Sequence, residues 1–144
     1  MVNIEDTVQV LRRTPLFQGL KKRQLERLAD SFVERQYLAG ETIVTQGKGG
    51  EGFFIIKEGL AEAIHTRSDD TSIVLNPLGE GEFFGELALL TDTMRTASVV
   101  ASEDTCCLAL TRWDFLTLLK EDADMAVTVL QELAARFSRV LNTL

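Results

Sequence analysis

The sequence is poor in the residue types that catalytic and metal sites most often use. It has one histidine, His65, and two cysteines, Cys106 and Cys107, which are adjacent. One imidazole and two neighbouring thiols do not make a zinc site, and no nucleophile stands in a recognisable motif with a histidine base. Neighbours on a strand point to opposite faces, so we expect two unbridged thiols in a reducing compartment. We expect no enzyme and no bound metal.

Positive charge and long apolar runs are also scarce. Fifteen Lys and Arg stand against 22 Asp and Glu, a net charge of −7, which argues against a nucleic-acid-binding surface. No run of about 18 apolar residues is present, so we expect no insertion into a membrane. The acidic start, residues 1–6, differs from the basic start of a secretory signal. These features predict a cytoplasmic location.

The chain has the length and apolar content of one folded domain, with 144 residues of which 45% are hydrophobic. We therefore expect a single domain over residues 1–144, opened by helices in residues 1–32. Ile4, Val8 and Leu11 have the spacing of one helix face, and Pro15 ends that helix. A second helix is expected over residues 22–32.

Residues 33–110 have the pattern of short β-strands. Apolar and β-branched runs alternate with glycine turns at intervals of about eight to twelve residues, which is typical of a sandwich or small barrel. The expected strands are residues 35–38, 42–44, 53–57, 60–66, 72–75, 96–101 and 105–110. The glycine-rich stretch 46–52 lacks the order GxxxxGK[ST] of a phosphate-binding loop, so it is interpreted as a strand connection.

The last part, residues 111–144, is expected to be helical. Thr111 has the position of an N-cap, and Trp113 is expected to pack in the core. A final helix over 124–142 carries apolar residues at alternating steps of four and three, as in a coiled coil. They are Ala126, Leu130, Leu133, Phe137, Val140 and Leu144. Three roles remain open for this face: packing on its own barrel, a dimer seam, or a lid over a ligand.

The most informative stretch is residues 83–99. Gly85 permits a close backbone approach and opens a short helical turn whose N–H groups suit an anion. Arg95, nine residues after Glu86, offers a guanidinium that matches the geometry of a phosphate. A carboxylate beside an anion repels phosphate oxygens, so Glu86 is expected to accept from a sugar hydroxyl. The stretch predicts a binding site for a sugar phosphate, or alternatively a helix with a surface salt bridge.

The family resemblance favours the receptor. Phe84-Gly85-Glu86-Leu87-Ala88-Leu89-Leu90 and Arg95-Thr96-Ala97-Ser98-Val99 closely resemble the phosphate-binding cassette of cyclic nucleotide-binding domains. The resemblance implies a mainly β fold with flanking helices: a jelly-roll β-barrel at 33–110, with the cassette at 83–97 and a C-terminal lid helix. One departure is Met94, where many relatives have proline.

The resemblance also implies roles for individual residues. The phosphate would be bound by Gly85, Leu87, Ala88, Arg95, Thr96 and Ala97. Glu86 would bind the ribose 2′-hydroxyl, and Arg136 and Val140 would contact the base. The ligand would be cAMP or cGMP; we favour cAMP.

The function implied is that of a regulatory sensor that closes its last helix over the bound base. Its partners would be the cyclic nucleotide, a second copy through the C-terminal helix, and an effector domain outside this chain. An alternative is an interaction or dimerisation module that retains the fold without a ligand. A metalloenzyme of the cupin type also uses a jelly roll, but the single histidine argues against it.

Overall fold

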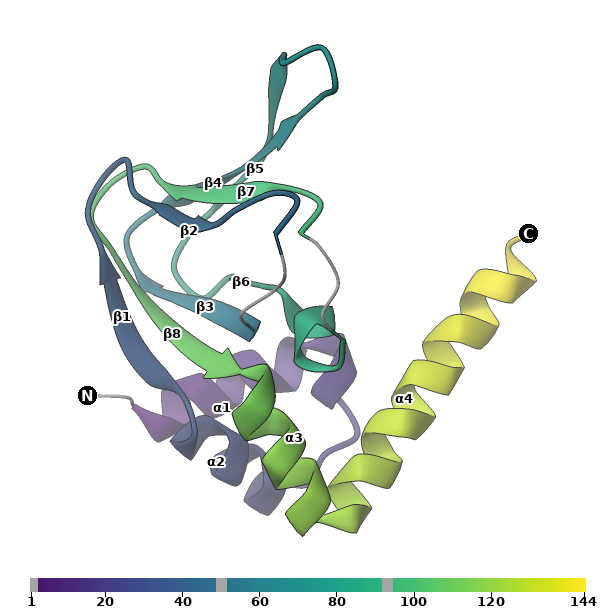
Figure 1. Ribbon diagram of the computed structural model, residues 1–144. Helices are drawn as coiled ribbons and strands as arrows, with labels where there is room; N and C mark the ends of the chain where they lie inside the picture. The colour runs from purple at the N-terminus through teal and green to yellow at the C-terminus, as the bar shows by residue number, and fades with distance from the viewer. Residues whose placement is uncertain (1–2, 49–51, 92–94) are drawn as a thin grey trace.

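The computed structural model describes residues 3–48, 52–91 and 95–144 (Figure 1). The helical segments are α1 (Ile4–Arg13), η1 (Pro15–Phe17), α2 (Lys22–Asp30), η2 (Glu86–Leu89), α3 (Arg112–Glu121) and α4 (Ala123–Asn142). The strands are β1 (Val33–Tyr37), β2 (Thr42–Val44), β3 (Gly52–Glu58), β4 (Ala61–Thr66), β5 (Ser72–Leu78), β6 (Phe83–Phe84), β7 (Ser98–Ala101) and β8 (Thr105–Thr111).

The strands form two antiparallel sheets, each of four strands. Their orders are β1-β8-β3-β6 and β2-β7-β4-β5. The two sheets face each other and enclose an apolar interior, which is the jelly-roll barrel expected from the sequence (Figure 1). The cassette leaves the first sheet at β6 and returns to the second at β7, so it lies at one opening of the barrel.

Side chains of the central strands alternate between the two faces of the sheet, so one sheet contacts both the barrel interior and the helices. On β3, Phe54 and Ile56 point into the barrel, whereas Phe53 and Ile55 point to the helices. Because both faces are covered, the strand reads as a continuous apolar run. The helix side holds Phe17, whose ring meets Phe53 edge-on with centroids 5.9 Å apart. The helices thus form a second core against the outside of the sheet (Figure 1).

Several predicted boundaries shift for local reasons. The first helix matches its predicted start and is capped by the Asn3 side chain, which accepts from the Asp6 N–H. The second helix ends two residues early, at Asp30. Strand β5 continues through Pro77, which an edge strand tolerates because its missing N–H faces no partner. Strand β7 begins only at Ser98, because the residues before it belong to the cassette.

The last helix projects from the body. Only Met125 and Val129 of its 20 residues are fully covered, and its far end lies well away from the barrel (Figure 1). Most of the expected apolar face is open, with Leu130 and Phe137 each 64% exposed. Of the three roles left open, packing on its own domain accounts for only part of this face: Leu133 contacts the core beside Met125 and Val129, whereas the other large apolar side chains of the face are exposed.

Trp113 also departs from its predicted place. It is 70% exposed instead of packing in the core, and the Arg112 guanidinium lies 5.1 Å from its ring centroid. The core positions of α3 are taken by Phe115 and Leu118. The N-cap prediction is confirmed, because the Thr111 hydroxyl accepts from the Asp114 N–H at 3.1 Å.

The two cysteines are unbridged and buried, on opposite faces of β8. Burial raises the pKa of the Cys107 thiol to about 12. Within the described ranges, no helix combines the length and hydrophobicity needed to cross a membrane. Over the same residues, no group of three His, Cys, Asp or Glu side chains is placed to hold a metal ion.

Candidate functional site

Gly85 is the turning point of the cassette. It follows β6 with φ +87°, a left-handed conformation that glycine adopts without strain. A Cβ built here would lie 2.5 Å from the Gly52 carbonyl oxygen and would overlap the Arg95 guanidinium. The close approach predicted for this glycine is thus made by the protein's own arginine and by the start of β3.

Arg95 is held through its backbone and its side chain. Its N–H donates to the Lys48 carbonyl and its carbonyl accepts from the Gly47 N–H, both at 2.9 Å. Its Nη2 donates to the Gly52 carbonyl oxygen at 2.6 Å, a short charge-assisted bond. The Gly52 bond sets the direction of this guanidinium, while Gly47 and Lys48, from the same part of the sequence, hold the Arg95 backbone.

The short helix η2 presents the next part of the site. The Ala88 N–H donates to the Gly85 carbonyl at 3.0 Å, which closes the first turn. An anion at this turn would have to share the Ala88 proton with that carbonyl. The side chain of Leu87 is 51% exposed, and those of Ala88 and Leu89 are buried.

Residues 85–88 and Arg95 line a cavity with a volume of about 500 Å³, which is within the range of small-molecule sites. One end, formed by residues 85–88 and 95–97, carries the Arg95 guanidinium and the Glu86 carboxylate. The remaining wall is mostly apolar and comes from both sheets and the β4–β5 hairpin. It comprises Val44, Ala63, Leu75, Asn76, Leu78, Phe83, Phe84 and Val99. A ligand with an anionic end and a flat apolar end matches this division.

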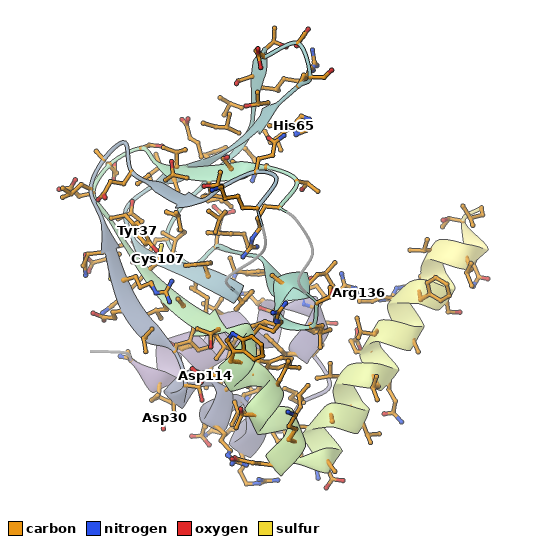
Figure 2. The ribbon with its side chains drawn as sticks, viewed as in Figure 1. Asp30, Tyr37, His65, Cys107, Asp114 and Arg136 are labelled. Carbon is orange, nitrogen blue, oxygen red and sulfur yellow. The ribbon has the colours of Figure 1, made fainter. Side chains whose placement is uncertain are left out.

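Glu86 points to the helical side of the site and has two protein partners. Its Oε2 accepts from the Leu16 backbone N–H at 3.3 Å. Its Oε1 lies 3.2 Å from Nη1 of Arg136, which reaches across from α4 (Figure 2). The side chains are 15% and 30% exposed respectively, so this ion pair is largely shielded from solvent. It ties the middle of α4 to the cassette.

The structure brings most of the predicted site residues together. All seven cassette residues line the cavity: Gly85, Glu86, Leu87, Ala88, Arg95, Thr96 and Ala97. Arg136 approaches the site through Glu86, whereas Val140 lies one turn further along α4 and is 57% exposed. Met94 lies outside the described residues.

Sequence reasoning missed the Gly52 carbonyl and the apolar wall. A backbone carbonyl leaves no side-chain signal, and the wall residues look like ordinary inward-facing strand positions.

Comparison with known proteins agrees with this geometry. The family model "Cyclic nucleotide-binding domain" matches residues 34–122. The chain belongs to the cyclic nucleotide-binding domain family. It is 36% identical over 110 residues to the cyclic AMP receptor protein of Thermus thermophilus, covering 76% of this chain and 51% of that protein. The chain thus spans about half the length of this relative.

Solved structures of the family superpose on nearly the whole chain. The N-terminal domain of a transcriptional regulator from Streptomyces coelicolor A3(2) superposes with a TM-score of 0.83 at 30% identity, covering 93% of this chain and 94% of that one. The regulatory domain of Toxoplasma gondii PKA with cAMP has a TM-score of 0.72 at 27% identity, covering 84% of this chain and 46% of that one.

Proposed function

We propose that this cyclic nucleotide-binding domain is a non-catalytic sensor of cAMP. The observation that carries the proposal is the placement of the Arg95 guanidinium and the cassette at one end of a cavity of about 500 Å³. The rest of that cavity is apolar enough for a purine. The family supports a cyclic nucleotide ligand, and the choice of cAMP is the finer part of the proposal.

Each part of the ligand has a chemical counterpart. The cyclic phosphate carries one negative charge, which Arg95 neutralises with help from the amides at the start of η2. The ribose 2′-hydroxyl donates to the Glu86 carboxylate, which suits a neutral donor and repels the phosphate. The Thr96 hydroxyl lies beside the phosphate end and is the group expected to influence the preference between cAMP and cGMP.

Ligand binding would act on α4 through Glu86. In this structure the carboxylate is engaged by Arg136, so the ribose hydroxyl and the guanidinium would meet at one group. A ligand shifts the position of α4 only by its differential affinity for the two arrangements. We infer that α4 closes over the base, bringing Arg136 and Val140 towards it.

Two further partners belong to this proposal. The open face of α4, with Leu130, Phe137 and Val140, has the spacing of a coiled-coil seam and would pair with a second copy. An effector domain outside residues 1–144 would receive the signal, because the chain spans only 51% of the receptor protein it resembles. In this proposal residues 1–144 form one folding unit in a reducing, cytoplasmic setting.

Calorimetric titration with cAMP tests the assignment of the phosphate site. Arg95→Ala should weaken binding by at least about a hundredfold, because it removes the partner of a largely desolvated charge. Arg13→Ala is a matched control: its Nη2 also donates to a glycine carbonyl, that of Gly81 at 3.0 Å, away from this cavity. Equal affinity of Arg95→Ala and wild type would refute the proposed site.

A second candidate is an interaction module without a ligand. The engagement of Glu86, the expected ribose-binding residue, by Arg136 and the open apolar face of α4 favour it. A ligand that binds only the native state raises the melting temperature, so thermal unfolding with and without cAMP or cGMP separates the two candidates. A shift supports the sensor, and no shift with either nucleotide supports the module.

A further inference from the structure

A histidine side chain on β4 binds the backbone at the end of the cassette, just before β7 begins. The β4–β7 ladder ends with the pair Ile64 and Ser98. Just beyond it, the side chain of His65 extends from β4 (Figure 2). Its Nδ1 lies 2.8 Å from the Thr96 carbonyl oxygen. A carbonyl oxygen can only accept, so Nδ1 carries the proton and donates it. The imidazole therefore extends the pairing where the backbone ladder stops.

Gln46 also forms hydrogen bonds with this region, to Ser98 at the start of β7 and to Thr66 at the end of β4. The Gln46 N–H donates to the Ser98 hydroxyl at 2.8 Å. Its side-chain amide forms two bonds with the Thr66 backbone, donating to the carbonyl and accepting from the N–H, each at 2.8 Å. Because Thr66 adjoins His65, the strand end that carries the imidazole is itself anchored.

These contacts surround the residue that carries the phosphate-binding charge. The backbone of Arg95 is bound on its N–H and its carbonyl by Lys48 and Gly47, and the next carbonyl, that of Thr96, is bound by His65. Residues 95–97 are not part of a strand, so these bonds supply the order that a ladder would otherwise give. A backbone ordered in advance lowers the entropy lost when a ligand binds.

We propose that His65 is a positioning residue for Arg95. It is not among the residues that line the cavity, and it acts by fixing the peptide after Thr96. This role rests on the proposed function, because the quantity that it raises is affinity for the cyclic phosphate. His65 is the only histidine of the chain, and its role needs a donor at one atom, Nδ1.

Substitutions that keep or move this donor test the proposal. His65→Asn places an amide N–H near the position of Nδ1, His65→Gln places it one methylene further away, and His65→Leu removes it. By calorimetry we expect cAMP to bind about three- to tenfold more weakly to the Leu and Gln variants, the value of one lost hydrogen bond. The Asn variant should stay within about twofold of wild type.

Thr66→Val is the matched control in the same strand end. It removes the hydroxyl that lies 3.0 Å from the Ser72 hydroxyl and leaves the backbone bonds to Gln46 in place. Its affinity should equal that of wild type. The melting temperature of each ligand-free variant is measured in parallel, and we expect the affinity loss in His65→Leu and His65→Gln without a matching loss in this control.

The outcomes separate the two proposals. If wild type binds cAMP and His65→Leu binds it equally well, the positioning role is overturned while the sensor remains. If Asn fails to restore affinity, or if Thr66→Val loses as much as Leu, the effect is general strand destabilisation and the role is again overturned. If wild type binds neither cAMP nor cGMP, the proposed function itself fails.

Discussion

Gly85→Ala, compared with Gly40→Ala, isolates the contact on which the site geometry depends. The two glycines have nearly the same positive φ, +87° at Gly85 and +89° at Gly40. A Cβ at Gly40 would meet nothing within 4 Å, whereas one at Gly85 would lie 2.5 Å from the Gly52 carbonyl oxygen and overlap the Arg95 guanidinium. The difference between the two variants therefore measures the contact without the backbone strain.

The magnitudes follow from the two contributions. Placing an alanine in the left-handed region costs about 1–2 kcal/mol, and this applies to both variants. At Gly85 the methyl also forces apart the Arg95–Gly52 hydrogen bond, and a bond from a charged donor contributes about 1.5–3 kcal/mol. We expect the free energy of unfolding to fall by about 1–2 kcal/mol in Gly40→Ala and by about 2.5–5 kcal/mol in Gly85→Ala.

Urea unfolding with linear extrapolation gives the two stabilities, and calorimetry gives the affinity for cAMP. Gly85→Ala should bind at least about tenfold more weakly, because the displaced guanidinium no longer faces the cavity. Gly40→Ala should bind as wild type does. If both variants lose the same stability and keep the same affinity, the reasoning about this contact is refuted.

Four other outcomes are expected. Arg136→Ala should speed amide hydrogen exchange in the second half of α4, at a cost below about 1 kcal/mol for a partly exposed ion pair; unchanged exchange would contradict its tethering role. Asp122→Ala should lower the melting temperature by about 3 °C and Asp122→Asn by much less, since either side chain can cap α4. The hydrogen bond from the Met125 N–H lowers the pKa of the Asp122 carboxyl below its ordinary value of 3.8. The ionised carboxylate therefore stabilises the fold above pH 3.8, and this contribution is lost as the pH falls below that value. Urea unfolding at about pH 6 and at about pH 3 measures the difference. Iodoacetamide at pH 8 should leave Cys107 unmodified in the native protein, because burial raises its pKa to about 12, and label it after unfolding.

The parts of the fold that local sequence determines were predictable. The spacing of Ile4, Val8 and Leu11 gives α1, and Pro15 marks the point where it stops. Thr111 supplies the cap of α3 by a contact only three residues long. The cassette could be placed as well, but by the resemblance of residues 84–90 and 95–99 to the family motif, since the chemistry of Gly85 and Arg95 alone left a helix with a surface salt bridge open. Each of these signals acts over less than about three helical turns.

The parts that depend on distant contacts were not predictable. Helix α4 has apolar residues on more than one face, so its periodicity does not reveal that Met125 and Val129 are the ones covered. Arg136 meets Glu86 across 50 positions of sequence, and the Gly52 carbonyl meets Arg95 across 43. Trp113 faces outward because Phe115 and Leu118 fill the core side of α3.

The anchoring of α4 has a mechanical consequence. A helix of 20 residues is about 30 Å long, and its covered contacts lie near its start, with the Arg136 ion pair beyond them. Rotation by about 10° around the Asp122 end would carry the far end through about 5 Å, given that length. A small change at Glu86, which pairs with Arg136 in the second half of the helix, would thus be amplified into a displacement of several ångströms at the end of α4.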